Sequence, residues 1–328
     1  MKMRSLIGFC CVTAVWIGGT LASPGEAPSP ASGKHLAPSS ALRQKQAEPA
    51  ALPAIDPAHL VREVVYNELH DHDSHGYWRY WIEKHSSRET QLQEEVETPE
   101  GPVSHLELTN GKPPSADEQQ EENSRLEHLL TSPGAQAQHR KEYAEDENRI
   151  GRILALLPDA FLYERISDET NRSEMRDCPC YHFHFQPNPN YPTHSIESRI
   201  FHAMAGDLWI GADNKRLVRL DGVLQDNVDF GYGILGRLYK GGWFRLERTR
   251  VTANGGAGDW KTRKLEVHMN GRAMLFKTIA RETSEVRGGF TPVPPGLSLQ
   301  QAAALAREPV EETASQPATI QPTAFVIR

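Results

Sequence analysis

The stretch that decides the fold reads Trp243-Phe244-Arg245-Leu246-Glu247-Arg248-Thr249-Arg250-Val251. In it, the apolar residues Phe244 and Leu246 alternate with the charged residues Arg245 and Glu247. A period of two is typical of an antiparallel strand that buries one face and exposes the other. The stretch therefore predicts a strand whose apolar side chains point toward a core.

The chain around this strand, residues 201–279, repeats the pattern in short runs separated by glycines and polar turns. A polar turn at residues 212–215 separates two of these runs. Asn270-Gly271, a strong hairpin signal, separates residues 264–269 from residues 272–279. No helical period of useful length interrupts the region, so it predicts an antiparallel meander, and its many glycines indicate bulges in a strongly curved sheet.

Further strands are expected on the N-terminal side of this meander. The aromatic run at residues 77–84, the alternating run at 103–108 and the weaker one at 90–98 predict three of them. Residues 161–166 and 180–185 predict two more. The fold class we expect is α+β, mainly antiparallel β, with a curved half-barrel-like meander sheet.

Helices are expected in two places. Asp56 followed by Pro57 gives an N-cap and a proline at the first helical position, which predicts an N-terminal helix over residues 57–69. Ser115 and Glu118 fit a capping box that opens a helical insertion over residues 115–157. Ser132-Pro133-Gly134 divides this insertion into a pair of helices, and the second carries an apolar stripe at helical spacing: Ile150, Ile153, Leu154 and Leu157.

The 328 residues carry a net charge of −7, which gives no electrostatic support for binding nucleic acid. A basic start followed by a short apolar run predicts a signal peptide over residues 1–22, so we expect a periplasmic or secreted protein. We interpret residues 23–55 as a disordered linker, 56–285 as a single domain and 286–328 as a flexible tail with a short helix near residues 297–306. Membrane contact would be peripheral at most.

Two groups of side chains suggest metal binding. His70, His72 and His75 lie in one short run, and Cys178, Cys180, His182 and His184 alternate along one predicted strand. Zinc needs donors within ~2.3 Å, whereas the ends of such a strand segment lie ~20 Å apart, so one strand cannot supply all four ligands. The alternative interpretations are a polar connection and a solvent-facing polar row opposite a core-facing aromatic row. A disulfide between Cys178 and Cys180 would be labile, and we expect no cofactor.

Several motifs carry a resemblance to known proteins. They are Asn67-Glu68-Leu69, Trp78-Arg79-Tyr80, Pro158-Asp159-Ala160-Phe161, Pro187-Asn188-Pro189-Asn190, the segment 230–238 and Lys240-Gly241-Gly242. Over residues 56–285 the chain resembles an uncharacterised family of exported bacterial proteins. More distantly, its helix-then-meander order resembles the periplasmic lipoprotein-carrier fold of outer-membrane lipoprotein sorting. That resemblance implies a half-barrel whose concave face holds acyl chains under a helical lid, although the long, charged insertion departs from it.

From these observations we predict a non-enzymatic binding protein for lipid or lipoprotein acyl chains. The residues expected to line the site are Ile150, Leu154, Leu157, Phe244, Leu246, Val267 and Phe276. The same residues could instead form an ordinary closed core. The alternative functions are an envelope module that senses or binds another protein and a metal-dependent hydrolase built on His70, His72 and His75 or on the group from Cys178 to His184.

Overall fold

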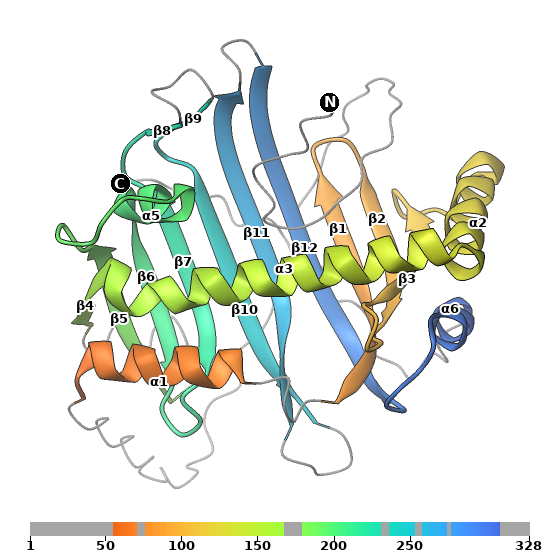
Figure 1. Ribbon diagram of the computed structural model, residues 1–328, viewed down its shortest axis with the longest axis horizontal. Helices are drawn as coiled ribbons and strands as arrows, with labels where there is room; N and C mark the ends of the chain where they lie inside the picture. Colours follow the sequence, from red (N-terminus) through yellow and green to blue (C-terminus); the bar gives the residue numbers. More distant parts are fainter. Residues whose placement is uncertain are drawn as a thin grey trace, which may run out of the picture.

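The computed structural model describes residues 55–70, 76–166, 179–230, 236–252, 258–273 and 277–308. Its centre is a curved, open, twelve-stranded sheet in the order β3-β2-β1-β12-β11-β10-β7-β6-β5-β4, with β8 and β9 beside this path (Figure 1). All strand pairs are antiparallel. The expected α+β fold with a curved, mainly antiparallel sheet is confirmed.

The strands are β1 Tyr77–Ser86, β2 Thr90–Val96, β3 Val103–Thr109, β4 Phe161–Arg165, β5 Cys180–Pro187, β6 Met204–Gly211, β7 Leu217–Leu224, β8 Val228–Phe230, β9 Gly236–Leu238, β10 Trp243–Val251, β11 Asp259–Ala273 and β12 Lys277–Val293. The helices are α1 Pro57–Leu69, α2 Ala116–Thr131, α3 Pro133–Ala160, α5 Ile196–His202 and α6 Leu299–Arg307. None of the helices in these described ranges is long and apolar enough to cross a membrane.

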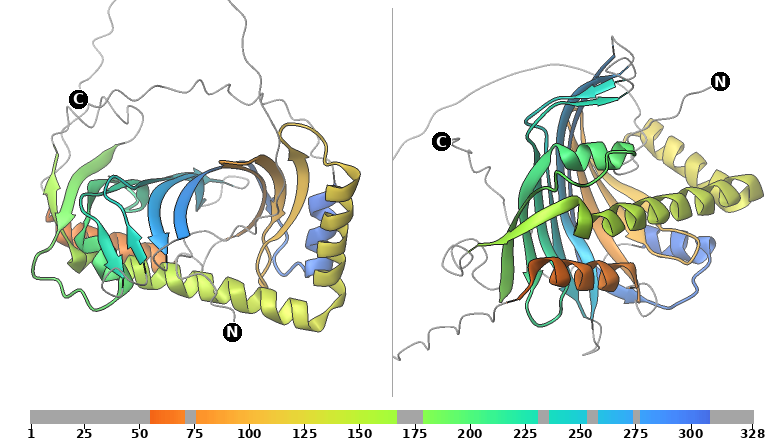
Figure 2. Two further views of the ribbon diagram at one scale, coloured as in Figure 1. Left: turned by 90° about the horizontal axis from the view of Figure 1, so that it is seen from above. Right: turned by 60° about the vertical axis from the view of Figure 1, so that its left-hand side comes forward.

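Three helices cover one end of the concave face of the sheet, which we call its inner face (Figure 2). Helix α1 begins as predicted, because the Asp56 side chain accepts a hydrogen bond from the Ala58 N–H at 3.1 Å and Pro57 follows the cap. It buries four aliphatic side chains, and α5 and the C-terminal part of α3 pack beside it on the same core. This first core holds Leu60, Val61, Val64, Val65, Phe183, Phe185, Phe201, Leu208 and Ile210.

Helix α3 crosses the inner side of the sheet from one end to the other (Figures 1 and 2). At its start, Gly101 of the β2–β3 connection lies against His139 and Tyr143, and Arg140 pairs with Glu100 at 2.6 Å. At its end, the chain passes directly into β4. Over its 28 residues the helix buries only Pro158 and Ala160, so its middle crosses the inner face without packing tightly on it.

A second core lies on the opposite face, at the β3 end of the sheet. There α2 and α6 pack on β2 and β3 through Val96, Val103, Leu126, Leu129 and Leu299. Helix α6 also buries Ala302, Ala303 and Ala306. The C-terminal region is therefore not wholly a flexible tail: residues 286–293 extend β12, and α6 is part of a core.

The predicted turn at Asn270-Gly271 is wrong. Both residues lie inside β11, where they pair with Ala280 and Ile279 of β12. Strand β9 also pairs with this end of β11, and a Cβ atom at Gly271 would lie 2.5 Å from the carbonyl oxygen of Arg237. The glycine therefore permits close approach of a neighbouring backbone and does not form a turn.

The outer edge of β3 is occupied by side chains of α2. The Leu106 N–H donates to Glu122 at 3.2 Å, and Arg125 donates to the Ser104 carbonyl at 2.6 Å. Arg125 also donates to Glu122 at 2.7 Å. The two side chains thus bond the backbone groups that a further strand would otherwise use.

Glu122 should make stability depend on pH. Burial opposes its ionisation, but hydrogen bonds from Arg125, His105 and the Leu106 N–H outweigh burial and lower its pKa to about 2. Because an unfolded Glu has a pKa of ~4.3, the contribution is complete above that value and is lost as the pH falls toward 2. In urea unfolding, we expect the difference between the native chain and Glu122→Gln, roughly 3 kcal/mol at neutral pH, to shrink between pH 5 and pH 2.

The exposed neighbour Glu121 provides the control, because the Glu121→Gln variant should match the native chain at every pH. A difference between the native chain and Glu122→Gln that stays constant down to low pH would contradict this account.

Two paired glycines make room for aromatic rings on the inner face. Gly206 pairs with Gly222, and Phe185 and Phe244 occupy the neighbouring positions of the same row. A Cβ atom at Gly222 would overlap the Phe244 ring and lie 2.9 Å from the Met204 sulfur. The rings therefore fill the space that side chains at these positions would need.

Gly222→Ala should accordingly lower the free energy of unfolding by about 1–3 kcal/mol, because the Phe244 ring must move. Thermal unfolding followed by circular dichroism measures the effect. Gly134→Ala, the same change in the first turn of α3, meets only an ordinary contact at 3.8 Å and should be neutral or slightly stabilising. Equal effects from the two changes would argue against close packing over Gly222.

Candidate functional site

The inner face of the sheet carries a continuous row of apolar side chains. Phe183, Leu208, Leu220, Leu246 and Leu265 lie in register across β5, β6, β7, β10 and β11. The row follows from the period-two alternation within each strand, because residues in register point to the same face. Four inter-strand spacings of ~4.8 Å give it a length of roughly 19 Å.

The helical cover becomes incomplete toward β10. Phe244 and Leu246 pack against the first core but stay only partly buried, whereas Leu265 and Val267 on the neighbouring strand β11 are buried. Above them, Leu154 and Leu157 of α3 are partly buried, while Ile150, one turn earlier, is 51% exposed. Of the seven predicted lining residues, three lie on α3, three lie on the inner face of β10 and β11, and Phe276 lies outside the described residues.

The row changes character after β11. Its next members are Glu285 on β12, Lys84 on β1 and Gln91 on β2. Glu285 is only 5% exposed and accepts a hydrogen bond from Arg287 at 2.9 Å, and Lys84 donates to Gln93 at 2.8 Å. The inner face is therefore amphipathic along the row, apolar from β5 to β11 and polar from β12 to β2.

Only the first residue of the predicted histidine metal site lies in the described structure, so that site stays a prediction. His70 ends α1, where its ring lies 4.1 Å from that of Tyr66 and its Nδ1 lies 2.8 Å from the Tyr66 carbonyl oxygen. His72 and His75 lie outside the described residues. Within the described ranges there is no group of three or more metal-binding side chains.

Strand β5 confirms the core-facing aromatic row, since Tyr181, Phe183 and Phe185 are buried. The opposite row is not wholly solvent-facing. Cys180 is buried and takes part in a disulfide, and Cys178 lies outside the described residues. His182 is buried against Trp209, with 4.3 Å between the rings.

Asp207 lies between the two histidines of β5, 3.2 Å from His182 and 3.4 Å from His184. Burial alone would raise the pKa of Asp207, but its hydrogen bonds with His182 and His184 outweigh burial and lower it. The arrangement is a hydrogen-bonded cluster that links β5 to β6.

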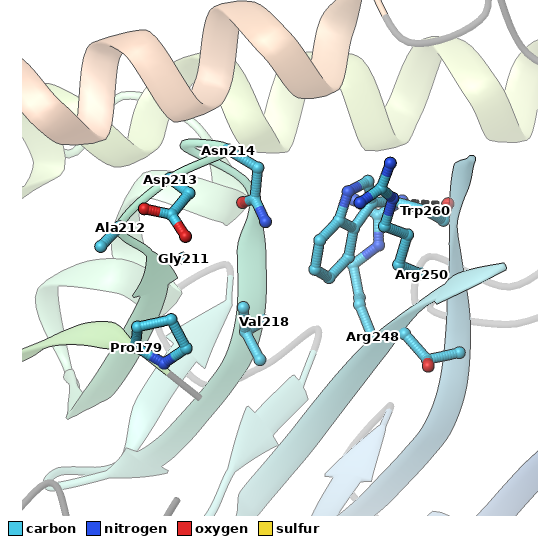
Figure 3. Close-up of a pocket in the computed structure, with 10 residues that line it drawn as sticks. Pro179, Gly211, Ala212, Asp213, Asn214, Val218, Arg248, Arg250 and Trp260 are labelled. Atoms are coloured by element: carbon cyan, nitrogen blue, oxygen red, sulfur yellow. Dashed lines mark hydrogen bonds between the residues drawn. The ribbon is translucent and has the colours of Figure 1, made fainter. Parts of the chain in front are cut away.

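A pocket lies where β7 and β10 separate. The two strands pair from Trp243 and Val223 as far as Glu247 and Arg219, and β10 then continues with β11 alone, after a bulge in β11. A pocket of about 200 Å³ occupies the gap. Asp213 and Asn214 form one side, and Arg248, Arg250 and Trp260 form the other (Figure 3).

Sequence reasoning missed this pocket, although it predicted the turn that supplies Asp213 and Asn214. The turn meets β10 because β8 and β9 leave the main sheet and allow β10 to pair with β7. No local pattern in the chain indicates that non-consecutive pairing.

Glu68 joins the two sides of the pocket to α1. Its carboxylate is only 4% exposed and accepts hydrogen bonds from Arg216, from the Leu217 N–H and from Arg248. Arg248 also donates to the Trp260 carbonyl oxygen at 2.6 Å. One buried carboxylate thus fixes the start of β7 and the end of β10 relative to each other.

Comparison with known proteins adds no family, because no protein-family model and no curated protein matches the chain. The resemblances drawn from its motifs stay predictions.

Removal of Glu68 should be costly. Glu68→Ala leaves the buried guanidinium groups of Arg216 and Arg248 without their carboxylate, and we expect the free energy of unfolding to fall by about 3–5 kcal/mol. Urea unfolding followed by circular dichroism provides the measurement.

Glu63→Ala is the matched control, because it makes the same change in the same helix. Glu63 and Lys215 form a pair at 2.7 Å, but both side chains are more than a third exposed. The control should therefore cost less than about 1 kcal/mol. A Glu68→Ala variant as stable as Glu63→Ala would show that Glu68 does not hold the two strands.

Proposed function

We propose that this is a non-enzymatic binding protein that holds the acyl chain of a lipid or lipoprotein on the inner face of its sheet. We further propose that it acts outside the cytoplasm, after export directed by residues 1–22. The resemblance to the periplasmic lipoprotein-carrier fold motivates the ligand class.

The observation that carries this proposal is the incomplete cover over β10, where Phe244 and Leu246 stay partly buried. Apolar side chains continue in register from the first core to Leu246 and Leu265, yet α3 buries no side chain between its start and Pro158. Ile150 faces the same way as the core-packed residues of its stripe and is still half exposed. A flexible apolar chain lying between α3 and β10 would remove this surface from water.

The polar end of the row suits an amphiphile. Buried or half-buried charged groups on β12 and β1 directly follow the apolar positions. An acyl chain that follows the row across β10 and β11 would place its polar end toward Glu285, Arg287 and Lys84. This polarity supports a lipid-like ligand more than a purely hydrocarbon one.

The test is native mass spectrometry of the mature chain purified from a periplasmic extract, with solvent extraction of bound molecules. We expect co-purified lipid or acylated peptide, and we expect the bound fraction to fall several-fold in Ile150→Asp, because a charge beside an acyl chain is strongly unfavourable. Phe244→Asp provides a second variant on the facing strand.

Leu162→Asp is the matched control. Leu162 on β4 is 47% exposed and points away from the first core, so the change should leave bound lipid unaltered. Ile150 is equally exposed, so both variants should fold. A native chain without bound lipid, or an equal loss in both variants, would reject acyl-chain binding at this site.

A further inference from the structure

We infer that the pocket between β7 and β10 binds a single sugar ring, either a free monosaccharide or the terminal residue of a glycan. The pocket shares no lining residue with Phe244, Leu246, Val267 or α3. The inference therefore stands independently of acyl-chain binding on the inner face.

The size of the pocket limits its ligand. Its volume of about 200 Å³ is below the ~300–1,000 Å³ of pockets that enclose drug-sized ligands. At ~30 Å³ for each water, it has room for roughly six or seven water molecules. A ligand of one ring fits this space, with the remainder of any longer chain left in solvent.

One part of the lining is apolar and flat. Trp260 is partly buried and packs on the cluster formed by Cys180, Trp209 and Val218, and Pro179 and Val218 line the pocket beside it. An indole fixed in this way offers a rigid surface for the C–H groups of a sugar ring at little cost in side-chain entropy.

The rest of the lining contains both hydrogen-bond acceptors and donors. Asp213 is exposed, and in the described part of the chain no hydrogen bond or ion pair engages its carboxylate. The carboxamide oxygen of Asn214 accepts a hydrogen bond from the Arg216 N–H at 3.0 Å, and the NH2 group of Asn214 takes no part in that bond. Thr249 and Arg250 add a hydroxyl and a guanidinium. Sugar hydroxyls donate and accept at the same time, so they match such a mixed lining.

The charges of the pocket favour a neutral ligand. The Glu68 carboxylate is shared between Arg216 and Arg248, and the lining carries side chains of both signs, Asp213 and Arg250. An anion would meet the Asp213 carboxylate, and a cation would meet the Arg250 guanidinium. A ligand of either charge therefore meets a group of its own sign, whereas an uncharged polyhydroxyl ring does not.

The walls are held in place before any ligand binds. On one side, Gly211 and Lys215 close the turn through hydrogen bonds at 3.0 Å, and Asn67 of α1 donates to the Lys215 carbonyl at 3.0 Å. On the other, Arg248 is fixed by Glu68 and by the Trp260 carbonyl oxygen. Because Glu68 bonds both sides, the spacing between Asp213 and Trp260 needs little rearrangement on binding.

The experiment is a titration of the full mature chain carrying 5-fluorotryptophan, followed by fluorine NMR. The mature chain carries five tryptophans, because Trp16 belongs to the expected signal peptide, and the Trp260 signal is identified as the one that disappears in Trp260→Phe. The probes are glucose, galactose, N-acetylglucosamine and the disaccharide cellobiose, with glycine betaine and inorganic phosphate as charged comparisons. We expect at least one sugar to shift the Trp260 signal saturably, with a Kd on the order of 1 mM.

Asp213→Asn should weaken sugar binding by ~10-fold or more, because a charged acceptor for hydroxyl groups is lost. Because no hydrogen bond or ion pair engages Asp213 within the described ranges, the variant should fold with an unchanged Tm. Asp226→Asn, at another exposed aspartate, should bind like the native chain. Tighter binding of cellobiose than of glucose would identify the terminal residue of a glycan as the ligand, and equal binding would identify a monosaccharide.

The inference is overturned if no sugar shifts the Trp260 signal at concentrations far above the expected Kd. It is also overturned if betaine or phosphate shifts the signal in place of the sugars, or if Asp213→Asn binds sugar as well as Asp226→Asn. Loss of bound lipid in the inner-face variants has no bearing on any of these results.

Discussion

The pairing of β1 with β12 is the constraint on which the rest of the structure depends. Strand β12 is 17 residues long, and it pairs with β11 along its first part and with β1 along its second. It thereby joins the N-terminal meander β1–β3 to the meander that ends the chain. This pairing places α2 and the β2–β3 connection at one end of the sheet while β4 lies at the other, so α3 must cross the inner face to connect them (Figure 2). At ~1.5 Å per residue its 28 residues span about 42 Å.

A helix that is fixed at both ends need not pack along its length. The start of α3 lies against Gly101, and its end is held by the Tyr163 hydroxyl, which donates to the Leu157 carbonyl at 2.6 Å, and by Arg62, which pairs with Asp159 at 3.1 Å. The two largest apolar cores of the described residues lie at the two ends of the sheet, on opposite faces, and two smaller clusters form around Trp78 and Trp209. The region between them keeps partly exposed apolar side chains, which is the property that a binding surface requires.

The polar contacts of α1 show how a local irregularity can be made rigid. Where β7 and β10 stop pairing, the sheet loses backbone hydrogen bonds, and Arg248 of the diverging strand bonds Glu68 of α1. Because the carboxylate is shared among Arg216, Arg248 and the Leu217 N–H, its burial is compensated. The same contacts that stabilise the gap also leave a pocket with fixed walls beside it.

The sequence by itself determined the elements whose signals are local. The alternation of Phe244 and Leu246 with Arg245 and Glu247 predicted β10 and its buried face, and Asp56 and Ser115 marked the starts of α1 and α2. These signals can be read from the sequence because helix caps and side-chain periodicity depend on only a few neighbouring residues. Only the tertiary structure decided that Gly271 lies within β11, that residues 286–293 extend β12 and that Asp213 faces Trp260 across a pocket. Each of these depends on the register between strands distant in sequence, and that register is set by packing and by non-local backbone pairing, which no short stretch of the chain encodes.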